Sequence, residues 1–191
     1  MEDSKRDTDV AVDNLQDALK ELAELDTLPM DDAFMPSVGQ VKRLFVYDEL
    51  MHPSVISRYL KNPRQEMICR APGFALVFNK FFPPRGSGLA SMVRTRRPED
   101  TVWGVTFDIT NEKLDDLDHA RGVPNRFHQR GLQVADRGGR KYAALTYVIS
   151  VPDEVPSKPS KSMLQLIVGG AKTRGLPDDY IALLEELETL D

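Results

Sequence analysis

The sequence predicts an α+β fold in which a twisted sheet closes toward a barrel and helices flank it. Two observations predict this fold class. Strand-like apolar runs and amphipathic helical stretches follow each other in the order β-α-β-β-β-β-α-β-β-α-α over residues 44–187. Most of the strands are joined by short connections with proline or glycine, which is typical of antiparallel neighbours. Hydrophobic residues make up 41 % of the chain, enough for the core that such a sheet requires.

The first predicted strand, residues 44–47, is a run of Leu, Phe, Val and Tyr without polar alternation. Such a run is typical of a strand that is buried on both faces. Asp48 and Glu49 end the run, and a helix with proline at its first position is expected over residues 53–61. A strand that turns directly into a helix presents backbone N–H groups at its end, where anions and small ligands often bind. An ordinary connection between a strand and a helix is the alternative interpretation.

Four further strands follow, and turn residues separate them. They are expected at residues 66–71, 74–82, 89–93 and 102–109. Gly104 in the last of these allows the backbone of a neighbouring element to approach closely. A hairpin is then expected, in which residues 127–134 pair with residues 141–149 around an Asp-Arg-Gly-Gly turn.

Three more helices complete the predicted fold. Thr110 is a suitable N-cap for a helix over residues 111–119. A helix over residues 162–173 is expected to end before Gly175, a typical C-cap. The last helix starts at Pro177, and its apolar residues lie three and four apart, so it buries one face.

Composition argues against several classes of function. The net charge is −5, so a general affinity for nucleic acid is not expected. No apolar run reaches the roughly 20 residues of a membrane-spanning helix, and the amino-terminal residues lack the apolar core of a secretory signal. The single cysteine, Cys69, cannot form an internal disulfide, which fits a reducing, cytoplasmic setting. No Cys or His spacing typical of a metal site occurs, so neither a metal nor a cofactor is expected.

Residues 1–40 differ from the rest of the chain in charge. They hold eleven acidic and three basic residues, a net −8, which leaves +3 for residues 41–191 because the whole chain carries −5. We therefore divide the chain into an acidic interaction arm, residues 1–40, and a domain, residues 41–191.

The arm is expected to bind a protein partner. An amphipathic acidic helix is predicted over residues 9–26, and an irregular linker over residues 27–40 follows it. The apolar side chains expected to contact the partner are Leu15, Leu19, Leu22, Met30, Phe34 and Met35. The alternative is that the leucine stripe docks on the chain's own domain or on a second copy, which would give a homodimer.

Four segments of the chain carry a resemblance to a known family. They are Leu-Phe-Val-Tyr-Asp-Glu-Leu-Met at 44–51, Gly-Leu-Ala-Ser-Met at 88–92, Val-Trp-Gly-Val-Thr-Phe-Asp-Ile at 102–109 with Leu-Asp-His-Ala-Arg-Gly-Val-Pro at 117–124, and Gly-Ala-Lys-Thr-Arg-Gly-Leu-Pro-Asp-Asp-Tyr at 170–180. With these segments the domain resembles the γ-glutamylcyclotransferase-like family, and in particular the cyclotransferases that act on free γ-glutamyl amino acids. The resemblance implies that family's mixed, barrel-like twisted sheet with flanking helices.

The resemblance also implies a reaction. In the family, the α-amine of a γ-glutamyl group attacks the side-chain amide carbonyl of the same group, which releases an amine and leaves 5-oxoproline. A glutamate takes a proton from the attacking amine and returns it to the leaving group, as a general base and acid. The pocket residues that the resemblance implies for this chain are Tyr47, Asp48, Glu49, Leu50, Gly88 and Arg121.

Two departures from the family's pattern change the charge of the implied pocket. Arg121 stands where the family has its catalytic glutamate, and an arginine remains protonated and cannot act as a base. Asp48 and Glu49 stand where the family's loop has Gly and then Ser or Thr, so acidic residues replace a neutral loop that holds the substrate. Because the two changes compensate each other in charge, we expect Arg121 to lie within salt-bridge distance of Asp48 or Glu49.

Three interpretations of function follow. The first is a cyclotransferase-like domain without activity, which serves as an accessory or partner-binding protein. The second is an active cyclotransferase in which Glu49 or Asp118 acts as the base, because geometry rather than sequence position decides which group does so. The third is a protein that binds a different small molecule, such as a cation, in the remodelled pocket. The sequence leaves open whether the chain is an enzyme.

Overall fold

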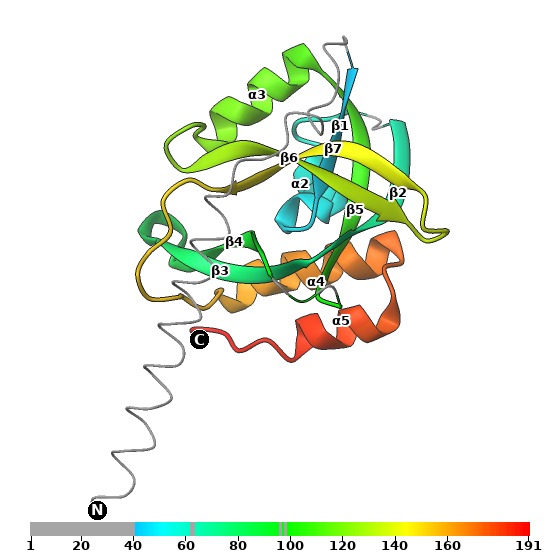
Figure 1. The fold of residues 1–191 in the computed structure, drawn as a ribbon. Coiled ribbons are helices and arrows are strands. Elements are labelled where there is room, and N and C mark those ends of the chain that lie inside the picture. Colours follow the sequence, from blue (N-terminus) through cyan, green and yellow to red (C-terminus); the bar gives the residue numbers. More distant parts are fainter. Residues whose placement is uncertain (1–40, 62–63, 96, 98) are drawn as a thin grey trace, which may run out of the picture.

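The computed structural model describes residues 41–61, 64–95, 97 and 99–191. The predicted interaction arm, with all its partner-binding side chains, lies outside the described residues. The elements of the domain follow the predicted order (Figure 1). They are β1 (Val41–Val46), the 3-10 helix η2 (Glu49–Met51), α2 (Pro53–Ile56), β2 (Arg64–Pro72), β3 (Phe74–Phe82), the 3-10 helix η3 (Pro83–Arg85), β4 (Ser87–Arg94), β5 (Thr101–Thr110), α3 (Asn111–Arg121), β6 (Phe127–Asp136), β7 (Lys141–Ile149), α4 (Lys161–Arg174) and α5 (Asp178–Glu185).

Five of the strands form a closed barrel in the order β1-β5-β2-β6-β7. Neighbouring strands within this order are antiparallel, and the barrel closes because β7 pairs with β1 in parallel. The prediction of an α+β fold with a barrel-like sheet is therefore confirmed. Strands β3 and β4 do not join the barrel but form a separate two-stranded sheet.

The second half of β1, residues 44–46, is buried on both faces, as its uninterrupted apolar run predicts. Because alternate residues of a strand point to opposite sides, Leu44 and Val46 belong to one core cluster, and Phe45 and Tyr47, just after the strand, to the other. Gly104 of β5 lies directly against this strand. A Cβ atom at this position would lie 2.2 Å from the carbonyl oxygen of Val46, so only glycine fits here without displacing backbone.

One predicted helix is shorter in the structure than expected. Helix α2 covers Pro53–Ile56 and does not extend over the whole of residues 53–61. The backbone N–H groups of Arg58 and Tyr59 donate to carbonyl oxygens three residues back, so the chain tightens into turns after the helix. Leu60 remains buried, as the predicted inner face of this segment requires.

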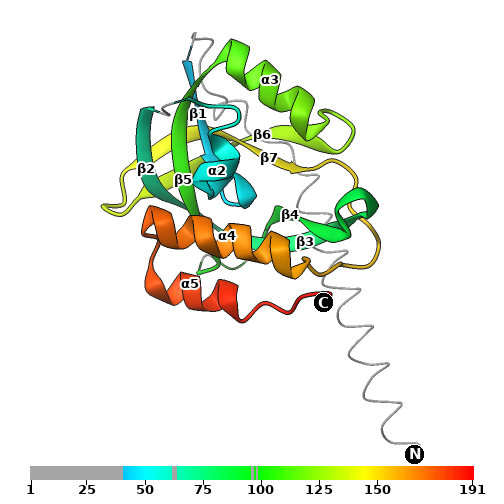
Figure 2. The same cartoon turned by 180° about the vertical axis from the view of Figure 1, so that it is seen from behind.

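The remaining helices fix the corner at which β1 ends. Helices α4 and α5 lie side by side below the barrel in Figure 1, and Figure 2 shows α4 from behind, between α5 and the barrel. Gly170 of α4 lies against η2, because a Cβ atom on it would come within 2.7 Å of the His52 backbone nitrogen. Helix α3 is capped by Thr110 and ends at Gly122, which has a φ of 72°, so the end of α3 is fixed as well. No helix among the described residues has the length and apolar character to cross a membrane.

Candidate functional site

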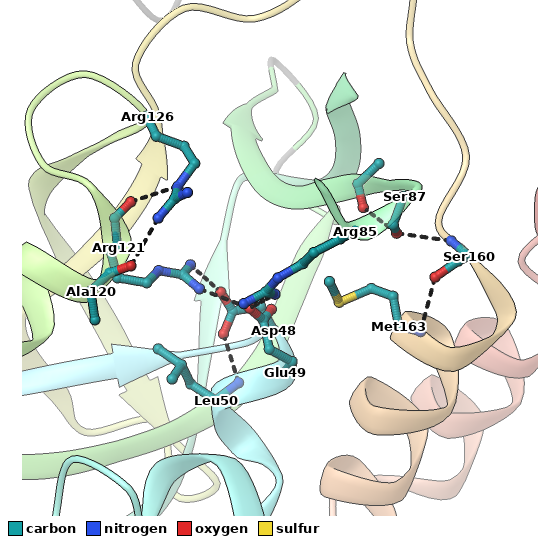
Figure 3. A network of polar contacts seen from close by, with 11 residues as sticks. Asp48, Glu49, Leu50, Arg85, Ser87, Ala120, Arg121, Arg126, Ser160 and Met163 are labelled. Carbon is teal, nitrogen blue, oxygen red and sulfur yellow. Dashed lines mark hydrogen bonds and ion pairs between the residues drawn. The ribbon is translucent and has the colours of Figure 1, made fainter. Parts of the chain in front are cut away.

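The candidate site lies where the end of β1 meets the end of α3 (Figure 3). Asp48 follows β1 and caps η2, and its Oδ1 accepts a hydrogen bond of 3.0 Å from the Leu50 backbone nitrogen. Glu49 is the first residue of η2, and Arg121 is the last residue of α3. All three charged side chains are buried, with exposed fractions of 2 % for Asp48, 6 % for Glu49 and 6 % for Arg121.

Arg121 forms a buried ion pair with each of the two carboxylates. Its Nη1 donates a hydrogen bond of 3.1 Å to Glu49 Oε1, and its Nη2 donates to Asp48 Oδ2. The prediction that Arg121 lies within salt-bridge distance of Asp48 or Glu49 is therefore confirmed for both. The guanidinium carbon also lies 3.9 Å from the centre of the Phe127 ring, a cation–π distance that adds to its fixed position.

A second arginine reaches the same cluster from the surface. Arg85, at the end of η3, donates from Nη1 to Glu49 Oε1 at 3.0 Å, and about half of its side chain (52 %) is exposed. One oxygen of Glu49 thus accepts from both arginines. Two carboxylates and two guanidiniums form the cluster, and their formal charges cancel.

The electrostatics of the cluster keep Arg121 and Glu49 charged. Burial alone would lower the pKa of Arg121, but the carboxylates of Asp48 and Glu49 outweigh this effect and raise it. Burial alone would raise the pKa of Glu49, but Arg121 and Arg85 outweigh it and lower that pKa. For Asp48, burial is the dominant effect and raises the pKa of its carboxyl against the attraction of Arg121.

Asp118, the other candidate base, belongs to a neighbouring hydrogen-bond group on α3. Its Oδ1 accepts from the Tyr147 hydroxyl at 2.5 Å, and its Oδ2 accepts from the Gln129 amide at 2.6 Å. Burial, and then this hydrogen bond and the charge of Asp118, raise the pKa of Tyr147. The hydroxyl of Tyr47 donates at 2.7 Å to the backbone carbonyl of Tyr147. Both carboxylate oxygens of Asp118 are therefore engaged by hydrogen bonds from neighbouring side chains.

A small cavity adjoins the ion-pair cluster, and a larger groove adjoins the cavity. The cavity has a volume of about 50 Å³, and Glu49, Leu50 and Arg121 line it together with residues that the sequence did not single out. The groove has a volume of about 350 Å³ and lies between η2, η3 and the start of α4. The cavity is much smaller than the roughly 300–1,000 Å³ of typical ligand pockets.

The structure brings together five of the six pocket residues that the sequence predicted. Tyr47, Asp48, Glu49 and Leu50 are consecutive, and Arg121 packs onto them. Gly88 is the exception, because it lines neither the cavity nor the groove. Its N–H donates at 2.8 Å to the backbone carbonyl oxygen of Lys158, and a Cβ on it would lie 2.7 Å from that oxygen. The ligand-binding role of these residues remains a prediction.

Sequence reasoning did not identify three arginines that line the cavity: Arg58, Arg85 and Arg126. Arg85 lies in a Pro-Pro-Arg-Gly turn that reads as an ordinary loop, and Arg58 follows the predicted start of a helix. Arg126 lies two residues after the segment 117–124, and that proximity is the one local signal for it. In the described part of the chain, no group of three His, Cys, Asp or Glu side chains is arranged to hold a metal ion.

Comparisons with known proteins show which proteins the chain is similar to. The model of the AIG2-like family matches residues 101–184. The γ-glutamylcyclotransferase of Mus musculus is 28 % identical over 158 residues, which cover 78 % of this chain and 82 % of that protein. The γ-glutamylcyclotransferase of Homo sapiens is 29 % identical over 140 residues, 70 % of this chain and 72 % of the human one. The chain is therefore similar in sequence to the AIG2-like family and to γ-glutamylcyclotransferases.

Solved structures confirm the fold of this family for the chain. A structure titled γ-glutamyl cyclotransferase superposes with a TM-score of 0.72 at 24 % identity and covers 79 % of this chain and 90 % of that one. An uncharacterized protein from Homo sapiens superposes with a TM-score of 0.71 over 80 % of this chain and 91 % of that one. The barrel with flanking helices is therefore the γ-glutamylcyclotransferase fold.

Proposed function

We propose that this chain is a γ-glutamylcyclotransferase-like protein without cyclotransferase activity, which serves as an accessory or partner-binding protein. The observation that carries the proposal is the buried pairing of Arg121 with Asp48 and Glu49. The sequence resemblance assigns Arg121 to the position of the family's general base. Because the two carboxylates raise the pKa of this guanidinium further, it holds its proton at every working pH.

The geometry favours this proposal over an active enzyme with a relocated base. Glu49 has a lowered pKa, so it is a weak base, and its Oε1 already accepts hydrogen bonds from two arginines. Both oxygens of Asp118 accept hydrogen bonds from neighbouring side chains. A general base must reach the proton that it removes, and the hydrogen bonds to Asp118 and to Oε1 of Glu49 favour structural roles for both carboxylates.

The release of 5-oxoproline from a panel of γ-glutamyl amino acids tests the proposal. The full chain is incubated with each compound, and the γ-glutamylcyclotransferase of Mus musculus serves as the positive control. No release above background is expected, because loss of a general base alone removes about 10²–10⁴-fold in rate. Turnover that is abolished in Glu49→Gln or Asp118→Asn would overturn the proposal and establish a relocated base.

We also propose that residues 1–40 are the partner-binding arm. The support is the uneven charge, a net −8 in the arm against +3 in the domain, together with the apolar stripe formed by Leu15, Leu19 and Leu22. An acidic arm accelerates association with a basic surface, and added salt slows that association.

Deletion of residues 1–40 tests this role. We expect the truncated domain to keep its midpoint of thermal unfolding and its oligomeric state, but to lose the partner that the full chain retains in a pull-down. A loss of stability or a change of oligomeric state would instead make the arm part of the fold or of a homodimer. If neither form retains a partner, the proposal is wrong.

A further inference from the structure

The cavity beside Arg121 has a strongly positive lining. Four arginines and one glutamate contribute to it, so the lining carries a net charge of +3. The Asp48 carboxylate behind Arg121 reduces the excess to +2 but does not remove it. The charged residues that line the cavity are Glu49, Arg58, Arg85, Arg121 and Arg126. We call this space the arginine cavity.

Several N–H groups around the arginine cavity lack partners within the part of the chain that the structure describes. The Nε atom of Arg121 is buried and has no hydrogen-bond acceptor there. A buried donor without an acceptor is costly and requires an explanation. Arg58 is exposed and forms no ion pair with a described residue. Arg85 uses one of its nitrogens on Glu49, and its other nitrogens are not committed to a carboxylate there.

Arg126 places a fourth guanidinium at the same cavity and is held in position by the backbone. Its Nε and Nη2 donate at 2.8 Å to the carbonyl oxygens of Arg121 and Ala120 (Figure 3). Burial lowers the pKa of Arg126, and the positive charges of Arg121 and Arg85 lower it further. Like charges are thus held together by fixed geometry, an arrangement that a bound anion would stabilise.

We propose that the arginine cavity binds a compact oxyanion, a carboxylate or phosphate group that is the head of a larger ligand. A volume of about 50 Å³ accepts such a head group but not a whole metabolite. The rest of the ligand lies in the adjacent groove of about 350 Å³, which shares Glu49, Val55, Arg58 and Arg85 with the cavity. Guanidinium groups are well suited to this role because their N–H donors match the oxygens of carboxylate and phosphate.

The groove determines what kind of ligand body fits. Hydroxyl groups line it on the sides of α2, β4 and α4, and Met163 and Leu166 add an apolar surface. Its serines are Ser54, Ser87, Ser160 and Ser162. We therefore expect a body with both hydroxyl or amide groups and a short apolar part. This ligand class differs from the cation named as an example in the third interpretation of the sequence, because Arg121 and Arg85 neutralise the two acids Asp48 and Glu49.

Titration of the full-length protein with inorganic phosphate and, separately, with acetate tests the proposal and distinguishes the two head groups. Ionic strength is held constant with sodium chloride, because exposed arginines also attract ions without specificity. Two-dimensional NMR of the arginine Nε–H groups gives the readout. We expect saturable shifts of the Arg58, Arg85, Arg121 and Arg126 signals with at least one probe, and no saturable shift for Arg94. Absence of saturable shifts with both probes would overturn the proposal.

Arg58→Gln provides a variant with a matched control. Arg58 is exposed and lines both the cavity and the groove, so its replacement is expected to leave the fold intact. Arg94→Gln removes the same charge from the far end of β4. Loss of one charged hydrogen bond should weaken binding of the effective probe about three- to tenfold in Arg58→Gln, and Arg94→Gln should bind like wild type. Equal affinities in the two variants would show non-specific ion binding and overturn the proposal. The arm and the catalytic question do not enter this test, so its outcome is independent of the proposed function.

Discussion

Replacement of Arg121 by methionine should destabilise the domain strongly at neutral pH. The side chain of methionine is unbranched and apolar, so it retains much of the packing of Arg121 but removes the charge. Asp48 and Glu49 then remain buried, and Asp48 loses the guanidinium that neutralises it. Glu49 keeps Arg85, whose side chain is 52 % exposed and therefore screened by water.

The size of the effect follows from the burial of the cluster. Removal of one partner from a buried ion pair typically costs about 3–5 kcal/mol, because the other charge is left without compensation. Total stabilities of single domains are about 5–15 kcal/mol, so the loss is a large fraction of the total. For a domain of this size, each kcal/mol corresponds to about 2–4 °C in Tm, so we expect a decrease of about 6–20 °C.

The pH dependence separates lost charge from lost packing. In the wild type, Arg121 and Arg85 lower the pKa of Glu49, so this group's contribution to stability is present above its unfolded pKa and is lost as pH falls through the folded pKa. In the variant, loss of Arg121 should raise the pKa of Glu49 and should raise further the pKa of Asp48, which burial already raises in the wild type. These groups then favour the folded state at low pH and oppose it as pH rises through their folded pKa. The difference in stability should therefore shrink from pH 7 to about pH 4.5.

Urea denaturation of both proteins at several pH values provides the measurement. Arg85→Gln is the control, because loss of a half-exposed partner should cost no more than about 1 kcal/mol. A variant Arg121→Met that loses less than about 1 kcal/mol at pH 7 would refute the reasoning. A difference that stays constant between pH 7 and pH 4.5 would also refute it, because lost packing alone does not titrate.

Two further predictions follow from the same geometry. Arg121→Glu alone should not produce 5-oxoproline, because it would place a third carboxylate beside Asp48 and Glu49, and the repulsion would exclude a substrate carboxylate; release of 5-oxoproline by this variant would contradict the prediction. Gly104→Ala should lower the free energy of unfolding by about 1–3 kcal/mol or more in thermal denaturation, because its Cβ would lie 2.2 Å from a backbone carbonyl oxygen of β1. Gly139→Ala is the control, because its Cβ would have no neighbour within 4 Å and only the strain of a positive φ should lower its stability.

The fold could be predicted from sequence because its determinants are local. The apolar run of residues 44–47 specifies a strand buried on both sides, and Thr110 and Gly175 mark the ends of helices through the hydrogen bonds and backbone angles that they provide. The separation of β3 and β4 from the barrel could not be predicted in this way. Strand pairing depends on contacts between distant residues, which a run of apolar residues does not encode.

The sequence predicted the contact of Arg121 with the two acids, but it did not predict the other arginines of the site. Asp48 and Arg121 are 73 residues apart, yet two opposite changes at motif positions sufficed to place them together. Arg85 lies 36 residues from Glu49 and pairs with it equally closely, but no motif position marks it. A single positive residue in a loop is usually exposed to solvent, so the sequence alone did not indicate the arginine cavity. The cavity forms because the fold brings η3, α3 and the turn after α2 together.

The ion-pair cluster connects the function of the site to the stability of the domain. Asp48 caps η2 through Leu50, η2 packs against α4, and Arg121 ends α3, so the same charges join three elements that are distant in sequence. A catalytic glutamate at position 121 would have to remain free for proton transfer, whereas the arginine stabilises the fold through its ion pairs with Asp48 and Glu49. The ion pairs that stabilise the fold therefore engage the side chain at position 121, which a general base there could not share. For this reason we expect that a change at Arg121 alone does not produce cyclotransferase activity, and that such activity requires simultaneous replacement of Asp48 and Glu49.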